Sequence, residues 1–128
     1  MTSFEDQNKN RILWAEALES GKYKQGANIL SYDDCFCCLG VMCDLEDSTL
    51  WTKDFLGPSN FWGRGMHKFY PPEDVLEKYG LNNLAYGKYS SMNDRGNSSF
   101  IEIAQEIRND VLERQKTQDG RSSVKDRE

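Results

Sequence analysis

The sequence predicts a single small α+β domain, in which three or four helices pack on a short antiparallel sheet. The chain has 128 residues, which is enough for one hydrophobic core and too few for two. Aromatic residues make up 12% of the chain, more than a wholly disordered chain would carry. Stretches of helical periodicity lie near both ends, and the middle is rich in turn residues and short β-forming runs.

The first predicted helix covers residues 4–20. Ser3 is expected to cap it, with Asp6 at the third helical position, and Gly21 suits a left-handed residue after its end. A turn-rich connector follows, and residues 27–32 are typical of a short strand. The second half of the helix supplies the apolar residues expected to be buried: Ile12, Leu13, Trp14, Ala15, Ala17 and Leu18.

The middle of the chain predicts a second helix within residues 35–45, although a strand through residues 34–39 fits the same apolar run. Residues 49–52 have strand character, and residues 56–72, with their glycines and prolines, are expected to form a long loop. A third helix is predicted over residues 72–79, which begin with proline and two acidic residues. Four residues of the second helix share one helical face: Cys38, Val41, Met42 and Leu45.

The last helix has the strongest sequence pattern. Before it, residues 84–86 are a possible strand and residues 93–96 have the chemistry of a turn. Ser99 and Glu102 then form a capping box, which marks a helix N-terminus. The residues expected on the buried face of this helix follow at helical spacing: Phe100, Ile103, Ala104, Ile107 and Val111.

The globular domain is expected to comprise residues 1–114, and residues 115–128, with Val124 as their one large apolar residue, predict a mobile charged tail. A net charge of -5 disfavours a protein that coats DNA with its whole surface. No apolar run approaches the roughly 20 residues that span a bilayer, and the N-terminus lacks the apolar stretch of a signal peptide. The sequence therefore predicts a soluble cytoplasmic protein without a membrane partner and leaves self-association into a homo-oligomer open.

Four cysteines lie close together: Cys35, Cys37, Cys38 and Cys43. This crowding disfavours a disulfide framework. Three other roles are open to the thiols: buried apolar side chains, zinc ligands together with His67, or a nucleophile with His67 as its base. A single histidine and the absence of two paired CxxC knuckles make burial the favoured role. We therefore expect no metal site, no cofactor and no catalytic residue.

Residues 61–70, here called the aromatic–basic segment, combine aromatic and basic side chains and contain no acidic residue. Aromatic faces stack on nucleobases, and arginine forms bidentate hydrogen bonds with phosphate, so the segment fits a nucleotide-sized ligand. In the alternative interpretation, the aromatic side chains pin a long loop to the core and the cations stay in solvent. The residues assigned here to ligand binding are Phe61, Trp62, Arg64, His67 and Lys68.

Two further clusters contribute candidate binding residues. In the turn after the first helix, lysines also complement the negative helix end, whereas the Gln25 amide is able to donate to and accept from a polar ligand. In residues 93–96, a turn that introduces the last helix is favoured over binding, and Arg95 stays a candidate contact. The candidates from these clusters are Lys22, Tyr23, Lys24, Gln25, Asn93, Asp94 and Arg95.

Three motifs in this order, WAEALESGKYKQG, CCLGVMCDL and MNDRGNSSFIEIAQEI, resemble a family of small bacteriophage and prophage proteins of uncharacterised activity. The likeness covers nearly all of the chain up to Arg108, whereas Cys35 and the FWGRGMHK insertion are peculiar to this chain. The resemblance implies a phage or prophage accessory protein that acts in the cytoplasm of an infected bacterium. It implies no reaction, and its bearing on function is an analogy.

These observations together predict a binding protein without catalytic activity. The favoured function is counter-defence, in which the aromatic–basic segment and residues 22–25 sequester a small phosphorylated nucleotide signal. The alternative is inhibition of a host bacterial protein through an acidic surface and exposed aromatic side chains, where opposite charge on the partner speeds association. Binding of a nucleotide, or of one host protein, to the purified chain distinguishes the two functions.

Overall fold

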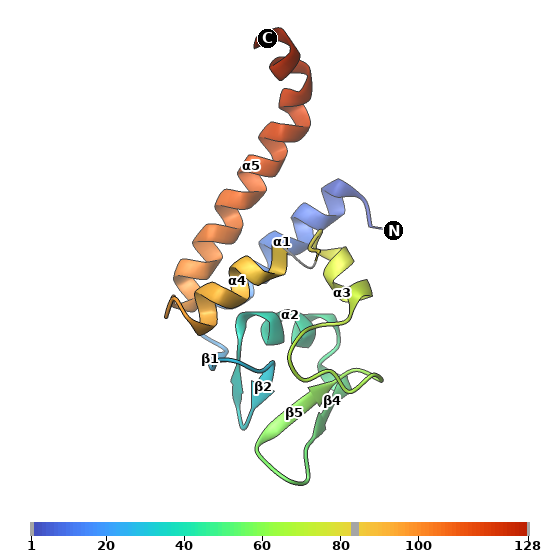
Figure 1. Ribbon diagram of the computed structural model, residues 1–128, viewed down its shortest axis with the longest axis vertical. Helices are drawn as coiled ribbons and strands as arrows, with labels where there is room; N and C mark the ends of the chain where they lie inside the picture. Colours follow the sequence, from blue (N-terminus) through green and yellow to red (C-terminus); the bar gives the residue numbers. More distant parts are fainter. Residues whose placement is uncertain (1, 83–84, 128) are drawn as a thin grey trace.

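The computed structural model describes residues 2–82 and 85–127 of the chain. Over these residues the chain forms five α-helices, one 3-10 helix and five short strands, arranged as a single α+β domain. The helix α2 lies between the sheet and a layer that contains α1, α4 and α5 (Figure 1). The predicted fold class is confirmed, but there are more helices than the expected three or four, and the sheet is mixed instead of antiparallel.

Helix α1 spans Phe4–Glu19 and begins as predicted. The Ser3 hydroxyl accepts a hydrogen bond from the Asp6 N–H at 3.0 Å, which satisfies an amide left free at the helix N-terminus. Gly21 follows the helix with a φ of +79°, a conformation that side chains other than glycine rarely adopt. The buried face is narrower than predicted, since Leu13 is 57% exposed. The buried apolar residues of α1 are Trp14, Ala15 and Leu18.

The strands of the described chain form one sheet in the order β1-β3-β2-β5-β4. Only the pairing of β1 with β3 is parallel, and the other three pairings are antiparallel. The strands are short, so each contributes few ladder hydrogen bonds, and α2 packs against them. Their bounds are β1 Lys24–Gln25, β2 Ser31–Tyr32, β3 Cys35–Phe36, β4 Trp51–Lys53 and β5 Ser59–Trp62.

Two predictions for the sheet are wrong in detail. The strand expected over residues 27–32 begins only at Ser31, because Asn28 has a φ of +75°, which does not continue a strand. The long loop expected over residues 56–72 contains β5, which pairs with both β2 and β4. The sequence of β5, Ser-Asn-Phe-Trp, places two polar residues before two apolar ones and so lacks the alternation that identifies a strand.

Helix α2 spans Cys38–Glu46 and follows β3 closely, so the strand and the helix considered for this run are both present. The Cys37 thiol caps the helix by accepting a hydrogen bond from the Gly40 N–H at 3.4 Å. A Cβ atom on Gly40 would come within 1.9 Å of the Leu30 carbonyl oxygen, so only glycine allows this close approach. The apolar residues that α2 buries are Cys38, Leu39, Val41, Met42 and Cys43.

All three tryptophan indoles donate hydrogen bonds to α2 or to the residue that ends it. Trp14 of α1 donates to the carbonyl oxygen of the first residue of α2 at 2.8 Å. Trp51 of β4 donates to the Asp44 carboxylate at 2.9 Å. Trp62 of β5 donates at 3.0 Å to the carbonyl oxygen of Asp47, the C-cap residue of α2. Helix α2 is therefore held from α1 and from both strands of the β4–β5 hairpin.

Two short helical segments connect the sheet with the rest of the domain. A 3-10 helix over Ser48–Leu50 leads from α2 into β4. Helix α3 spans Glu73–Lys78, within the predicted range, and Pro72 is its N-cap residue. Acidic residues in its first turn and a lysine in its last turn complement the helix dipole.

Helix α4 spans Ala85–Asp94, where the sequence pattern suggested a strand. The strand expected over residues 84–86 is wrong for residues 85 and 86, which begin α4, and Leu84 lies outside the described residues. Packing stabilises α4 despite its weak helical pattern, because the ring of Tyr89 meets that of Trp14 edge-on with centroids 5.3 Å apart.

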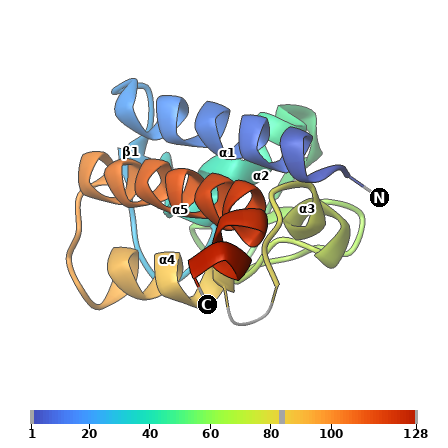
Figure 2. The ribbon, with the colours of Figure 1, turned by 90° about the horizontal axis from the view of Figure 1, so that it is seen from above.

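Helix α5 spans Phe100–Arg127 and lies side by side with α1 (Figure 2). The capping box is confirmed, since the Ser99 N–H donates to the Glu102 carboxylate at 2.8 Å and the Glu102 N–H donates to the Ser99 hydroxyl at 3.1 Å. The helix continues over residues 115–127 beyond the other elements (Figure 1), and the mobility of this segment stays a prediction. The expected buried face is also confirmed: Phe100, Ile103, Ala104, Ile107 and Val111.

Candidate functional site

The aromatic–basic segment forms the second half of β5 and a tight turn after it. Trp62 and His67 exchange both backbone hydrogen bonds across this turn, at 2.8 and 2.9 Å. Gly63 has a φ of +80° in the turn. The His67 imidazole lies over Gly65, where a Cβ atom would come within 2.6 Å of Nε2. The glycines on either side of Arg64 therefore serve the turn and the packing of His67.

Trp62 belongs to the core and does not offer a stacking surface. It is 4% exposed, and its indole N–H is engaged by the Asp47 carbonyl oxygen. Stacking on a nucleobase needs an open ring face, which burial removes. The prediction that Trp62 contacts a ligand is therefore wrong, and the alternative that the aromatic side chains pin the segment to the core holds for this residue.

Other aromatic side chains of the segment lie around Lys68. The Lys68 ammonium is 6.0 Å from the ring centroid of Phe61 and 5.6 Å from that of Phe69, at the outer edge of cation–π range. Phe61 is half-buried, Phe69 is 53% exposed and Arg64 is exposed. Tyr70, the last residue of the segment, is 50% exposed, so the segment keeps two exposed rings and two cations. We call Phe61, Lys68 and Phe69 the lysine–aromatic cluster.

Tyr23 is tied to the fold through its hydroxyl and through its ring. The hydroxyl donates to the Asp44 carboxylate at 2.7 Å, and the ring meets that of Phe36 edge-on with centroids 5.2 Å apart. Partial burial and the hydrogen-bonded carboxylate raise the pKa of Tyr23 above its ordinary value. Lys22 and Lys24 are exposed. In this turn, the lysines and not Tyr23 are therefore open to a ligand.

Gln25 uses its side-chain amide to join β1 to the start of α5. Its Nε2 donates to Asn93 Oδ1 at 2.9 Å and to the Ser98 carbonyl oxygen at 2.8 Å. Its Oε1 accepts a hydrogen bond from the Phe100 N–H at 3.0 Å. That N–H is one of the amides without an intrahelical partner in the first turn of a helix. Recognition of a ligand by Gln25 would therefore compete with three structural hydrogen bonds.

Asn93 and Asp94 complete the same joint from the end of α4. Asn93 is 4% exposed, and its Nδ2 donates to the Gly26 carbonyl oxygen at 2.8 Å and to the Asp94 carboxylate at 2.9 Å. The Asp94 carboxylate also accepts from the Asn28 N–H at 2.9 Å. Both side chains therefore hold the loop after β1 against the end of α4. The amide junction comprises Gln25, Asn93 and Asp94.

A shallow depression of about 450 Å³ lies beside the amide junction. The junction amides that face it are engaged in the hydrogen bonds described above, so the side-chain donors left for a ligand are the exposed Asn97 amide and hydroxyl groups. Arg95, the remaining candidate of this turn, is exposed. The residues that line the depression are Gln25, Gly26, Ala27, Tyr32, Asn93, Asn97, Ser98 and Ser99.

The structure joins two of the three predicted clusters and separates the third from them. Residues 22–25 and residues 93–95 meet at the amide junction. The aromatic–basic segment starts from β5, and β3 and β2 lie between β5 and β1 in the sheet. Adjacent strands are about 4.8 Å apart, which places β1 and β5 about 14 Å apart. Residues 22–25 and the aromatic–basic segment therefore start from strands that two other strands separate.

Three of the four cysteines lie in the core, as the favoured interpretation predicts, and Cys35 of β3 is half-buried. Burial raises the pKa of Cys37 to about 12 and raises the pKa of Cys38 and Cys43 as well. A thiol with a raised pKa holds little thiolate near neutral pH, which weakens it as a nucleophile. Among the described residues, no group of three or more His, Cys, Asp or Glu side chains is placed to hold a metal ion.

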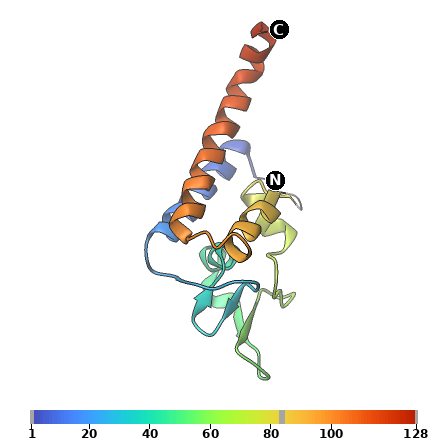
Figure 3. The ribbon, with the colours of Figure 1, turned by 60° about the vertical axis from the view of Figure 1, so that its left-hand side comes forward.

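Two apolar side chains at the turn between β4 and β5 are almost wholly exposed, Phe55 at 100% and Leu56 at 96%. The turn is ordered, because the Asp54 carboxylate accepts from the Leu56 N–H at 2.9 Å and the Asp54 N–H donates to the Ser59 carbonyl oxygen at 3.0 Å. We call residues 54–58, which protrude from the sheet (Figure 3), the hairpin tip. The adjacent Gly-Pro pair signals a turn, but a hairpin is identified only when β5 is known.

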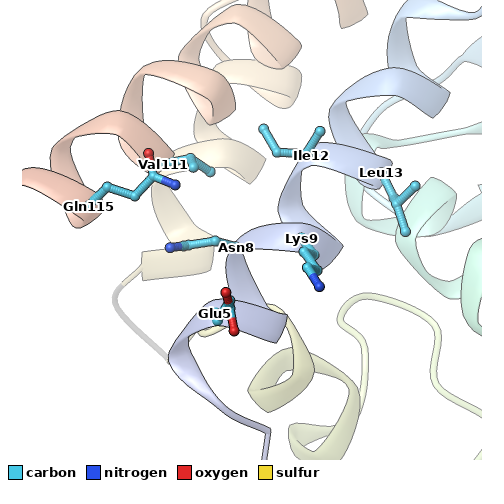
Figure 4. Close-up of a pocket in the computed structure, with 7 residues that line it drawn as sticks. All are labelled: Glu5, Asn8, Lys9, Ile12, Leu13, Val111 and Gln115. Carbon is cyan, nitrogen blue, oxygen red and sulfur yellow. The ribbon is translucent and has the colours of Figure 1, made fainter. Parts of the chain in front are cut away.

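A second apolar feature is a groove of about 480 Å³ at α1 and α5 (Figure 4), here called the α1–α5 groove. Ile12 of α1 extends toward Val111 of α5 across this groove. Leu13, which also lines it, was expected in the buried stripe of the first helix but is largely exposed. The residues that line the groove are Glu5, Asn8, Lys9, Ile12, Leu13, Val111 and Gln115.

Within the described ranges, no helix combines the length and the apolar character needed to cross a membrane. Residues 6–85 match the family described as "Domain of unknown function (DUF8296)". The match covers nearly all of α1, the whole sheet, α2 and α3, and therefore includes the hairpin tip and Trp62. No curated protein and no solved structure matches the chain. Because the match extends over more than half of its length, the chain belongs to the DUF8296 family.

Proposed function

We propose that this chain is a binding protein without catalytic activity and that it recognises a partner protein through its hairpin tip. The exposure of Phe55 and Leu56 carries this proposal. Single exposed apolar residues are ordinary, but an adjacent aromatic and aliphatic pair with almost no contact to its own chain leaves apolar area open to water. Aromatic side chains that enter a partner's pocket are frequent energetic centres of protein interfaces.

The hairpin tip is suited to binding because its backbone is already ordered. The Asp54 carboxylate closes the turn at the Leu56 N–H, and Pro58 fixes one backbone dihedral. The Pro58 carbonyl oxygen accepts a hydrogen bond from the Asp33 N–H at 2.7 Å, which ties the base of the tip to the turn between β2 and β3. A loop held in its bound shape loses less conformational entropy on association, so a small contact suffices for useful affinity.

The chemistry of the tip indicates an apolar pocket on the partner. Lys53 and Asp54, the charged residues beside the apolar pair, have opposite signs, so the tip itself favours neither an acidic nor a basic pocket. The net charge of -5 acts at longer range and speeds association with a basic protein. The resemblance to phage and prophage proteins makes a host bacterial protein in the cytoplasm of an infected cell the proposed partner.

A second candidate function, sequestration of a phosphorylated nucleotide, is supported by the lysine–aromatic cluster. Phe69 is 53% exposed beside Lys68, and Arg64 is exposed in the preceding turn, which provides a stacking face and cations for phosphate. Two of the residues predicted to contact the nucleotide have structural roles instead, because Trp62 is buried in the core and Gln25 is hydrogen-bonded in the amide junction. We therefore favour protein binding through the hairpin tip over nucleotide binding by the lysine–aromatic cluster.

Photo-crosslinking tests the protein-binding proposal. A photoreactive phenylalanine analogue at position 55 is expected to crosslink one bacterial protein, and wild-type chain is expected to compete for it. The double variant Phe55→Ser with Leu56→Ser, called the tip variant, is expected not to compete. Ile101→Ser, which replaces a 66% exposed residue on α5, is the matched control and is expected to compete like the wild type. Equal competition by the tip variant would contradict the proposal.

Calorimetry separates the second candidate function from the first. Cyclic nucleotides and ADP-ribose derivatives are titrated into the wild type, Arg64→Ala and Phe69→Ala, with Lys53→Ala as the control. If the chain acts through the hairpin tip alone, no nucleotide is expected to bind to any of the four. Nucleotide binding that is weakened by Arg64→Ala and Phe69→Ala, and unchanged by Lys53→Ala, would establish the nucleotide function instead.

A further inference from the structure

The α1–α5 groove offers an apolar hollow that the proposed function does not use. Its apolar lining comes from Ile12 and Leu13 of α1 and Val111 of α5, and Figure 4 shows Ile12 extending toward Val111. Its volume of about 480 Å³ is roughly three times that of an engineered cavity that holds benzene. The groove is therefore large enough for an aromatic and an aliphatic side chain together.

The hairpin tip presents such a pair of side chains. Phe55 and Leu56 are consecutive, almost wholly exposed and held by the turn at Asp54. Within one chain the tip lies at the far end of the β4–β5 hairpin, and α2 and most of the sheet lie between it and the helices α1 and α5 that form the groove (Figures 1 and 3). The tip is therefore unable to reach the groove of its own chain, and the two features meet only between copies.

The charged residues around the two features are compatible with such a contact. Lys53 and Asp54 are next to the apolar pair of the tip, and Glu5 and Lys9 line the groove one helical turn apart. Each surface thus carries one cation and one anion, so one orientation brings Lys53 to Glu5 and Asp54 to Lys9. Exposed ion pairs of this kind set orientation more than they add affinity.

We propose that the hairpin tip of one copy of the chain binds in the α1–α5 groove of a second copy. The contact joins two different surfaces and is heterologous, so an open assembly keeps a free tip at one end and a free groove at the other. Association therefore grows with concentration into short chains, or closes into a ring where the geometry allows it.

This inference does not rest on the proposed function, because self-association needs only the two surfaces. The two interactions do compete for the tip, since a tip seated in a groove is hidden from a partner protein. Self-association would then cover the tip until a partner protein is present. A partner that binds the tip more tightly than the groove does would dissociate the assembly. Crosslinking at position 55 is accordingly expected to give a product with a second copy in concentrated pure protein.

Light scattering on the full chain tests the inference. The weight-average mass of the wild type is expected to rise with concentration between about 10 µM and about 1 mM, the range typical of a small interface. The tip variant and the groove variant Leu13→Glu are each expected to stay monomeric, whereas the control Ile101→Ser associates like the wild type. Circular dichroism verifies that each variant is folded.

Mixing the two variants tests the heterologous geometry. The tip variant keeps an intact groove and Leu13→Glu keeps an intact tip, so an equimolar mixture is expected to form dimers and nothing larger. A wild type that stays monomeric up to about 1 mM overturns the inference. Association that persists in either variant alone also overturns it, in favour of a contact between like surfaces. Leu13→Glu leaves the tip intact for a partner protein, so the proposed function and this inference are able to fail separately.

Discussion

The amide junction and the hairpin tip place their side chains in opposite settings. At the junction, Gln25 and Asn93 have side chains suited to ligand recognition, yet they bond to each other and to backbone groups. At the tip, Phe55 and Leu56 have side chains suited to a core, yet they are almost wholly exposed. Removing a polar side chain from water costs free energy unless it finds hydrogen-bond partners, and exposing an apolar side chain to water costs free energy unless something covers it.

The difference lies in whether that compensation is present. The junction amides of Gln25 and Asn93 are hydrogen-bonded, and Asn93 is buried. None of the buried side-chain nitrogen and oxygen atoms in the described chain lacks a partner. The exposed pair at the tip is compensated by nothing within the described part of the same chain. For this reason we propose the binding surface at the uncompensated side chains of the tip, and not at the junction, whose side chains resemble ligand contacts only in their chemistry.

Trp62→Ala is expected to have the largest effect, because it removes the base of the hairpin while leaving the tip in place. Loss of a buried tryptophan and of its hydrogen bond to Asp47 is expected to lower the free energy of unfolding by about 3–5 kcal/mol. Urea denaturation followed by circular dichroism measures this change. Phe61→Ala, on the half-buried neighbour, is the control, and an equal loss in both variants would contradict the core role of Trp62.

Asn93→Ala breaks the amide junction directly. It leaves the Gly26 carbonyl oxygen and the Gln25 amide without one partner each, and a loss of about 1–3 kcal/mol is expected. A double-mutant cycle with Gln25→Ala measures the coupling between the two side chains. The exposed neighbour Arg95→Ala is the control. Full additivity of the two changes would show that the junction does not act as a unit.

Deletion of residues 115–128 is expected to change the melting temperature little, because Val124 is the one large apolar residue that it removes and the buried residues from Phe100 to Val111 stay in place. Truncation from residue 108 onward is the comparison. It also removes Val111 and Arg114, whose guanidinium donates to the Asn8 side chain at 2.8 Å. The melting temperature of this shorter chain is expected to fall by several degrees. A large fall on the first deletion alone would refute the prediction of a mobile tail.

The tip variant is expected to have the smallest effect on stability, within about 0.5 kcal/mol of the wild type, because exposed side chains contribute little to folding. Its effect should instead appear in binding and in self-association. Thermal denaturation at low protein concentration measures the stability. A clear loss of stability would mean that Phe55 or Leu56 packs against the domain in solution, and the contrast with the amide junction would then disappear.

The elements that could be predicted from the sequence are those specified by local chemistry. Ser3 caps α1, and the reciprocal Ser99–Glu102 bonds begin α5, within a few residues of the apolar pattern that they introduce. The burial of Cys37, Cys38 and Cys43 follows from their place in an apolar run. In each case the deciding contact lies within one helical turn or one continuous stretch of chain.

The parts that could not be predicted depend on contacts between distant residues. The role of Gln25 is set by Asn93 and Phe100, which are 68 and 75 positions away along the chain. Helix α4 depends on the packing of Tyr89 against the first helix, which outweighs its weak propensity. The hairpin tip is recognised only once β5 is known, because β5 is the second strand of the hairpin. Its pairing with β2 and β4 is defined by the sheet and not by its own sequence.

The convergence of three tryptophans on α2 gives the protein an intrinsic fluorescent reporter. Trp14, Trp51 and Trp62 approach this helix from three elements, and each indole donates a hydrogen bond to it or to its C-cap residue. Indole emission is sensitive to such bonds and to water, so separation of α2 from any of the three elements should change the spectrum. The hairpin tip contains no tryptophan. Binding of a partner at the tip that leaves α2 in place should therefore not change the tryptophan emission spectrum. A change in emission on binding would show that the rearrangement reaches the centre of the domain.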